Sequence, residues 1–150
     1  MEKAEIKRNL LQVCRGRLLE TIANLEAAMA DAQQQANEYG APKDRYDSFR
    51  TQLMRRRDMM AQQLTKELSE LKALEMIDPD RKIDSVGFGA VVITQTHSYF
   101  ISIGLGKVEL ASRPYYAISP VVPLSHELTG KKKGDRILFR GQEIVIQDIF

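Results

Sequence analysis

The chain has 150 residues and a net charge of +2, and the segments 1–77 and 78–150 each carry a single excess positive charge. This balance argues against a free-standing nucleic-acid-binding domain in either segment, so any electrostatic role must come from local patches.

The one cysteine, Cys14, excludes an intramolecular disulfide and fits a reducing compartment. No apolar run approaches the ~20 residues of a membrane span, and the charged first residues do not resemble a secretion signal, so we expect a cytoplasmic protein.

The first half of the chain is predicted to form one long antiparallel helical hairpin of the coiled-coil type, occupying residues 1–77. Apolar residues recur at steps of three and four on both sides of a bend near 38–44, which places one apolar stripe on each helix. Gly40 suits the position after a helix end, and Pro42 prevents the helix from continuing. The tip of the hairpin is therefore predicted near residues 39–47. The stripes are Ile6, Leu10, Val13, Leu18, Ile22, Leu25, Met29, Ala32, Ala36 and Tyr39, then Tyr46, Phe49, Leu53, Met60, Leu64, Leu68 and Leu71.

Arginines follow the predicted tip on the second helix. At 100° per residue, Arg56 and Arg57 fall on either side of the Leu53/Met60 seam, and Arg50 lies close to Arg57. Their stems can lie along the seam while the guanidinium groups reach water. Two interpretations remain open, a solvated charged face and a patch that contacts phosphates.

Two acids precede these arginines. Asp44 and Asp47 are three residues apart, which places both carboxylates on one face of the first turn of the second helix. Such a pair can act simply as helix-end charges. It can also share a Mg²⁺ ion that keeps several waters and obtains its other ligands elsewhere.

The second half, 78–150, is predicted to be a small domain with a different architecture. After Asp78-Pro79 the hydrophobic pattern changes to period two and β-branched and aromatic residues dominate. These features predict a sheet of four or five strands with one short helix, and hence an α+β protein. The predicted strands are Phe88–Thr94, Ser98–Ile103, Val108–Leu110, Tyr115–Ile118, Ile137–Phe139 and Glu143–Ile149, and the helix is Pro123–Leu128.

The chain carries few residues arranged for chemistry of its own. His97 and His126 have no cysteine or glutamate at metal-ligand spacing. The run Gly104-Leu105-Gly106-Lys107 lacks the glycine spacing and the strand–loop–helix setting of a phosphate loop. We therefore expect a protein that is not itself an enzyme.

The layout resembles the Gre family of bacterial transcription elongation factors. A long helical hairpin is followed by a small sheet domain that opens with Val86-Gly87-Phe88-Gly89-Ala90. The run from Ile118 to Pro123, followed by Leu128-Thr129-Gly130-Lys131, resembles the family's I-S-x-x-S-P…L-x-G-K pattern. The resemblance is strong in 86–150 and architectural in 3–77.

This resemblance implies an FKBP-like C-terminal domain that docks on RNA polymerase, with Pro123 in the docking run. It implies that the hairpin enters the secondary channel and meets nascent RNA there, which would be the role of Arg50, Arg56 and Arg57. It also implies that two tip acids, here Asp44 and Asp47, help to hold the second catalytic Mg²⁺, so that the polymerase cleaves backtracked RNA. We expect a monomer that binds no cofactor alone and shares this Mg²⁺ with the polymerase.

The chain departs from the family pattern in two places. The tip phrase G-D-L-S-E-N-A-E-Y is absent; alignment on Gly40 places Ala41 and Asp44 at the acid positions, whereas alignment on spacing gives Asp44 and Asp47. Val122 also stands where the family has serine.

Three other functions compete with this interpretation. A non-cleaving regulator of the secondary channel would have an altered tip. A peptidyl-prolyl isomerase is disfavoured because the chain has no tryptophan to line a proline pocket. A coiled-coil chaperone is disfavoured because the predicted tip is mostly polar.

Overall fold

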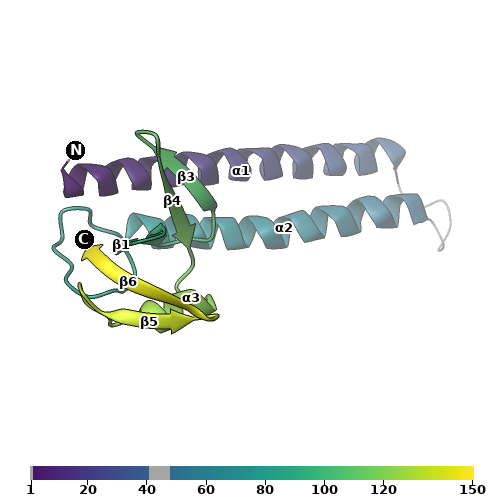
Figure 1. Ribbon diagram of the computed structural model, residues 1–150. Coiled ribbons are helices and arrows are strands. Elements are labelled where there is room, and N and C mark those ends of the chain that lie inside the picture. The colour runs from purple at the N-terminus through teal and green to yellow at the C-terminus, as the bar shows by residue number, and fades with distance from the viewer. Residues whose placement is uncertain (1, 41–47) are drawn as a thin grey trace. The chain divides into compact units, whose positions relative to one another are not determined.

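The computed structural model describes residues 2–40 and 48–150 (Figure 1). Within these ranges the chain forms long N-terminal helices followed by a six-stranded sheet and one short helix, so the predicted α+β class is confirmed. None of the described helices contains a stretch long and apolar enough to cross a lipid bilayer. The elements are α1 Lys3–Tyr39, α2 Ser48–Glu75, β1 Val91–Thr94, β2 Ser98–Ile101, β3 Gly106–Leu110, β4 Arg113–Ile118, α3 Pro123–Leu128, β5 Arg136–Phe139 and β6 Gln142–Ile149.

The chain divides into two compact units. The first, which we call the sheet unit, contains Met1–Arg15 and Ala73–Phe150. The second, which we call the distal hairpin, contains Gly16–Lys72. The sheet unit therefore includes the first turns of α1 and the end of α2 as well as the sheet.

Part of the predicted apolar stripes is buried in the distal hairpin, whereas Phe49 and Leu68 are exposed. Small side chains at Ala32 and Ala36 allow the two backbones to approach closely, and both are buried. Near the end of α1 the rings of Tyr39 and Phe49 lie 4.8 Å apart between centroids, which joins the end of α1 to the start of α2. The antiparallel hairpin predicted from the 3.6-residue period is thus present. Its other buried apolar residues are Leu18, Ile22 and Leu53.

The sheet has the strand order β3-β4-β2-β1-β6-β5. Neighbouring strands are antiparallel except for β2 and β4, which are parallel. The predicted count of four or five strands was too low, because the β5–β6 hairpin joins the same sheet through β6. The first strand also begins at Val91 rather than Phe88, because Gly89 has a φ of 90° and forms a turn before the ladder.

Both faces of the sheet are covered within the sheet unit. On one face, Val92 and Ile101 pack with Leu128 of α3 in the core. On the other face, Val91 and Phe100 form a cross-strand pair and are also fully buried. The first turns of α1 lie against this second face, where Lys3 Nζ pairs with Asp148 Oδ2 at 2.9 Å and Ile6 borders a hollow with Tyr115 and Leu110.

One side chain of the sheet unit is costly to bury. Lys7 of α1 is only 1% exposed, and its Nζ atom is buried without a hydrogen-bond partner among the described residues. Burial lowers the pKa of Lys7 from 10.5 to about 8, although the negative charge of Asp78 opposes this effect. A buried ammonium group without a partner opposes folding.

We therefore expect Lys7→Met to stabilise the protein at pH 7 by about 3 kcal/mol, since the pKa of Lys7 falls from 10.5 to about 8 and one pKa unit corresponds to about 1.36 kcal/mol. The folded state releases the proton near pH 8 and the unfolded chain near 10.5, so the wild type should gain stability between these values. The advantage of the variant should shrink over the same range. Urea unfolding of both proteins from pH 7 to 9.5 measures this, and a constant difference across pH would contradict it.

Candidate functional site

The acids predicted to hold Mg²⁺ lie outside the described residues. Asp44 and Asp47 both fall in the segment 41–47, as does Pro42. Within residues 2–40 and 48–150, no group of three or more His, Cys, Asp or Glu side chains is placed to hold a metal ion. The metal role of the two acids thus remains a prediction from sequence.

The arginines of α2 that follow this segment differ in their surroundings. Arg50 Nε donates a hydrogen bond to the carbonyl oxygen of Gly40, 3.1 Å away. Gly40 follows the last residue of α1 with a φ of 87°, and its N–H donates to the carbonyl of Ala36. Arg50 therefore satisfies a carbonyl at the end of α1 and ties the two helices together.

Arg57 makes a second link between the helices. Its Nη1 atom donates to Gln33 Oε1 of α1 at 2.5 Å, and its Nη2 atom contacts Asp58 Oδ1 at 3.0 Å. The first bond is partly buried. Sequence reasoning missed this role, because Gln33 lies 24 residues away along the chain and the pairing requires the register of the two helices.

Arg56 is exposed, whereas Arg50 and Arg57 are half-buried. It borders a small hollow of about 70 Å³ in the distal hairpin, too small for an organic ligand. Of the three arginines, Arg56 is therefore the one best placed to contact a partner outside the chain. The hollow is otherwise lined by Ala28, Asp31, Ala32, Gln35, Leu53 and Met60.

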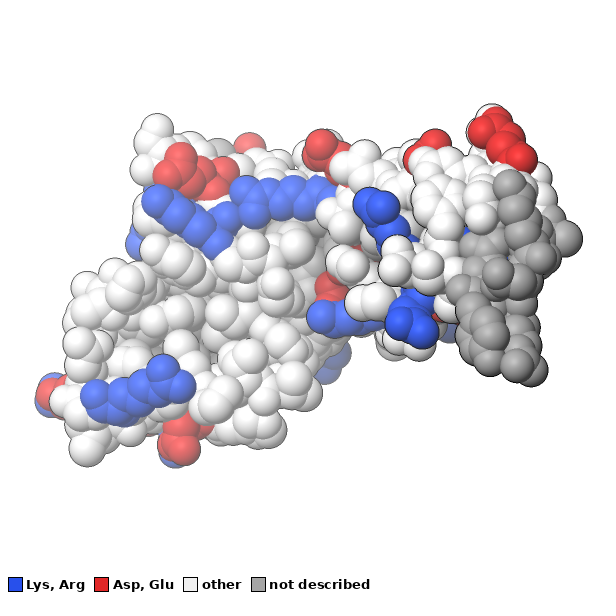
Figure 2. All heavy atoms as spheres, turned by 90° about the vertical axis from the view of Figure 1, so that its right-hand side faces the viewer, with Lys and Arg blue, Asp and Glu red and all other residues white. Residues whose placement is uncertain are grey.

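Charged side chains of both signs lie on the face shown in Figure 2. Lys and Arg side chains form several separate groups there, with acidic side chains among them (Figure 2). This agrees with the near balance of charge in the sequence. Recognition of nucleic acid on this face would depend on individual arginines rather than on a large electrostatic field.

The run around Pro123, which the resemblance predicts to dock, contains exposed apolar side chains of the sheet unit. Val122 occupies the N-cap of α3 without a side-chain hydrogen bond, and Pro123 follows at the first helical position. The helix is held from inside, because buried Ser125 donates from Oγ to the carbonyl of Ser119 at 2.7 Å. Pro123 is exposed, and neighbouring Val121 is 72% exposed. Two apolar side chains are thus exposed beside a helix whose buried Ser125 is hydrogen-bonded.

His97 lies in an aromatic group that the sequence did not predict. Its ring centroid is 5.3 Å from that of Tyr116 and 6.0 Å from that of Tyr99. Partial burial, followed by the nearby Tyr116, raises the pKa of Tyr99. Because His97 itself is exposed, this group is a surface feature of the sheet unit. His126 is also exposed, on α3.

Comparison with known proteins adds no family assignment. A scan against protein-family models finds no model that matches the chain. A search of curated proteins likewise finds no match. The functional proposal therefore depends on the architecture and on the residues that resemble the Gre pattern.

We expect the two neighbouring arginines to respond differently to the same substitution. Arg57→Gln removes a partly buried bond between the helices and should cost about 0.5–1.5 kcal/mol in the free energy of unfolding. Arg56→Gln is the matched control and should change it by less than about 0.5 kcal/mol, because Arg56 is exposed. Urea unfolding followed by far-ultraviolet circular dichroism measures both. Equal losses would contradict the structural role assigned to Arg57.

Proposed function

We propose that this protein binds bacterial RNA polymerase, inserts its helical hairpin into the secondary channel and promotes cleavage of backtracked RNA. The observation that carries the proposal is the combination of a long helical hairpin with a six-stranded mixed sheet bearing one short helix. This is the architecture that the Gre resemblance implies. The residues of the resemblance, from Ile118 to Lys131, form the end of β4, α3 and the turn after it.

The proposed insertion into the channel requires a long hairpin whose two helices are held together at their far ends. Helix α1 has 37 residues and so spans about 55 Å. At its far end, Arg50 and the Tyr39–Phe49 ring contact hold the end of α1 to the start of α2. The chain between these two anchored positions contains Asp44 and Asp47. In the proposal, these two acids supply the carboxylates that act at the active centre of the polymerase.

In this proposal the chemistry belongs to the polymerase. Asp44 and Asp47 contribute oxygen ligands to the second Mg²⁺, and the polymerase and water supply the others. When bound there, such an ion would supply a lowered pKa for the attacking water and stabilisation of negative charge on the phosphate. Arg56 contacts a phosphate of the displaced RNA, a contact that weakens as salt rises.

Docking is assigned to the sheet unit. Val121 and Pro123 present an exposed apolar surface at the start of α3. Burial of such a side chain at the centre of an interface typically contributes more than its neighbours at the rim. Val122, where the family has serine, leaves the α3 N-cap without a side-chain hydrogen bond, so the docking contact here is more apolar.

The cleavage role is tested by Asp47→Asn in backtracked transcription complexes. We expect the variant to bind polymerase like the wild type and to lose stimulated cleavage, because a neutral amide is a poor Mg²⁺ ligand. Asp44→Asn should do the same. Asp31→Asn, an exposed position on α1, is the matched control and should retain activity. Cleavage is measured as the rate of RNA shortening at fixed Mg²⁺.

A wild-type protein that binds polymerase without stimulating cleavage would contradict the proposed role of the two acids. The non-cleaving channel regulator would then be the better description. The sequence observation in its favour is that the chain lacks the family's tip phrase.

The docking assignment is tested by placing a charge on the proposed surface. Val121→Glu should weaken polymerase binding at least tenfold, because a buried carboxylate without a partner opposes association. Leu138→Glu on the edge strand β5 is the matched control, since Val121 and Leu138 are both 72% exposed. Binding is measured by titration of labelled protein with core polymerase. Equal effects of the two substitutions would exclude α3 as the docking point.

A further inference from the structure

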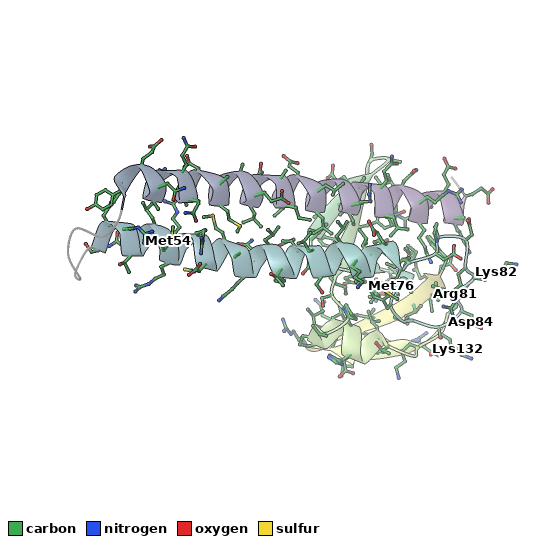
Figure 3. The ribbon with its side chains drawn as sticks, turned by 180° about the vertical axis from the view of Figure 1, so that it is seen from behind. Met54, Met76, Arg81, Lys82, Asp84 and Lys132 are labelled. Atoms are coloured by element: carbon green, nitrogen blue, oxygen red, sulfur yellow. The ribbon has the colours of Figure 1, made fainter. Side chains whose placement is uncertain are left out.

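The sheet unit contains a hollow of about 680 Å³ that the proposed function does not use. It lies between the first turns of α1, the loop 79–84 and the last two residues of the chain described, and all of these segments belong to the sheet unit. Figure 3 shows Arg81, Lys82 and Asp84 on the loop that follows α2, beside the first turns of α1. Its volume falls within the usual range for small-molecule sites.

Basic side chains outnumber acidic ones around this hollow. The two acids are Asp80 and Asp84, and Asp80 Oδ1 is already paired with Arg8 Nη1 at 2.7 Å. Among the basic side chains, Lys3 Nζ is already paired with Asp148 Oδ2 at 2.9 Å, which leaves Lys7, Arg81 and Lys82 against Asp84. The walls therefore favour an anion over a cation. The basic residues that line the hollow are Lys3, Lys7, Arg81 and Lys82.

Lys7 is the observation that points to a ligand. It lines the hollow, yet it is 1% exposed and its Nζ atom has no hydrogen-bond partner among the described residues. An ammonium group has three donors to satisfy, and a buried charge is normally paired. An anionic oxygen bound against Lys7 would supply the missing partner.

The rest of the lining shows what else the ligand contains. Ile83, Ile149 and Phe150 contribute apolar surface to the same hollow. Lys3 Nζ lies 5.8 Å from the centroid of the Phe150 ring, so the apolar and basic parts of the wall adjoin. A fully polar anion would leave this apolar surface without a contact.

We propose that this hollow binds a small organic phosphate, with the phosphate group against Lys7 and the apolar part against Ile83, Ile149 and Phe150. A phosphate suits several surrounding cations, because its oxygens accept charge-assisted hydrogen bonds in more than one direction. Arg81 and Lys82 line the same hollow from the loop and supply two further cations. The site lies in the sheet unit and requires no contribution from the distal hairpin.

The test is titration of the full chain with phenyl phosphate by isothermal calorimetry, with inorganic phosphate and phenol as separate probes. We expect saturable binding of phenyl phosphate, at least tenfold tighter than that of either probe. Lys7→Met should weaken this binding at least tenfold, because the charged partner is lost. Lys72→Met, the same substitution at an exposed position of the distal hairpin, should leave it unchanged.

A second variant keeps the test independent of the fold around Lys7. Arg81 and Lys82 are exposed, so the double variant Arg81→Gln/Lys82→Gln should fold normally and also bind phenyl phosphate at least tenfold more weakly. Absence of saturable binding by the wild type would overturn the proposal. Wild-type affinity in a folded Lys7→Met variant or in the double variant would overturn it as well, as would equal affinity for inorganic phosphate. None of these results depends on polymerase.

Discussion

The sheet unit depends on one constraint, the burial of its strand β1 on both faces. Val91 and Val92 are successive residues and point to opposite sides of the sheet, yet both are fully buried. Helix α3 covers the side of Val92 through Leu128. The other side needs a second layer, and Lys3 and Ile6 of α1 lie there. The first turns of α1 therefore complete the core of the sheet unit.

The same packing explains why Lys7 is buried. Lys7, Leu10, Cys14 and Leu18 succeed one another at steps of three and four along α1, and all four are buried, so they share one helical face. Residue 7 lies on this buried face, where an apolar side chain would be expected. The ammonium group of Lys7 there lowers the free energy of unfolding. Residues that lower the stability of the fold in this way frequently lie at functional sites. A ligand in the hollow beside Lys7 would explain why this residue is buried there.

Sequence periodicity predicted the helices well and the sheet less completely. The helix Pro123–Leu128 has the predicted bounds, because proline at its first position and Gly130 after it are strong local signals. The six strand segments were each located, but their order depends on pairing between distant residues, such as the parallel register of Tyr99 with Tyr116. The turn at Gly89 moved the start of β1, because a positive φ is not visible in a hydrophobic pattern.

The links of Arg50 to Gly40 and Arg57 to Gln33 could not be predicted, since they require the register of the two helices. The burial of Lys7 had a signal in its spacing from Leu10 and Cys14, but its charge argued against a core position.

The central claim is that the far end of the hairpin reaches the polymerase active centre. The chain permits a direct measurement, because Cys14 is its only cysteine and is fully buried. An iron chelate attached to Glu38→Cys, an exposed position one residue before the end of α1, generates hydroxyl radicals that cut nearby backbone. In complex with core polymerase, the account expects cuts in the segments that surround the secondary channel and the catalytic Mg²⁺. Cuts confined to the outer surface of the polymerase, or none at saturating protein, would contradict it.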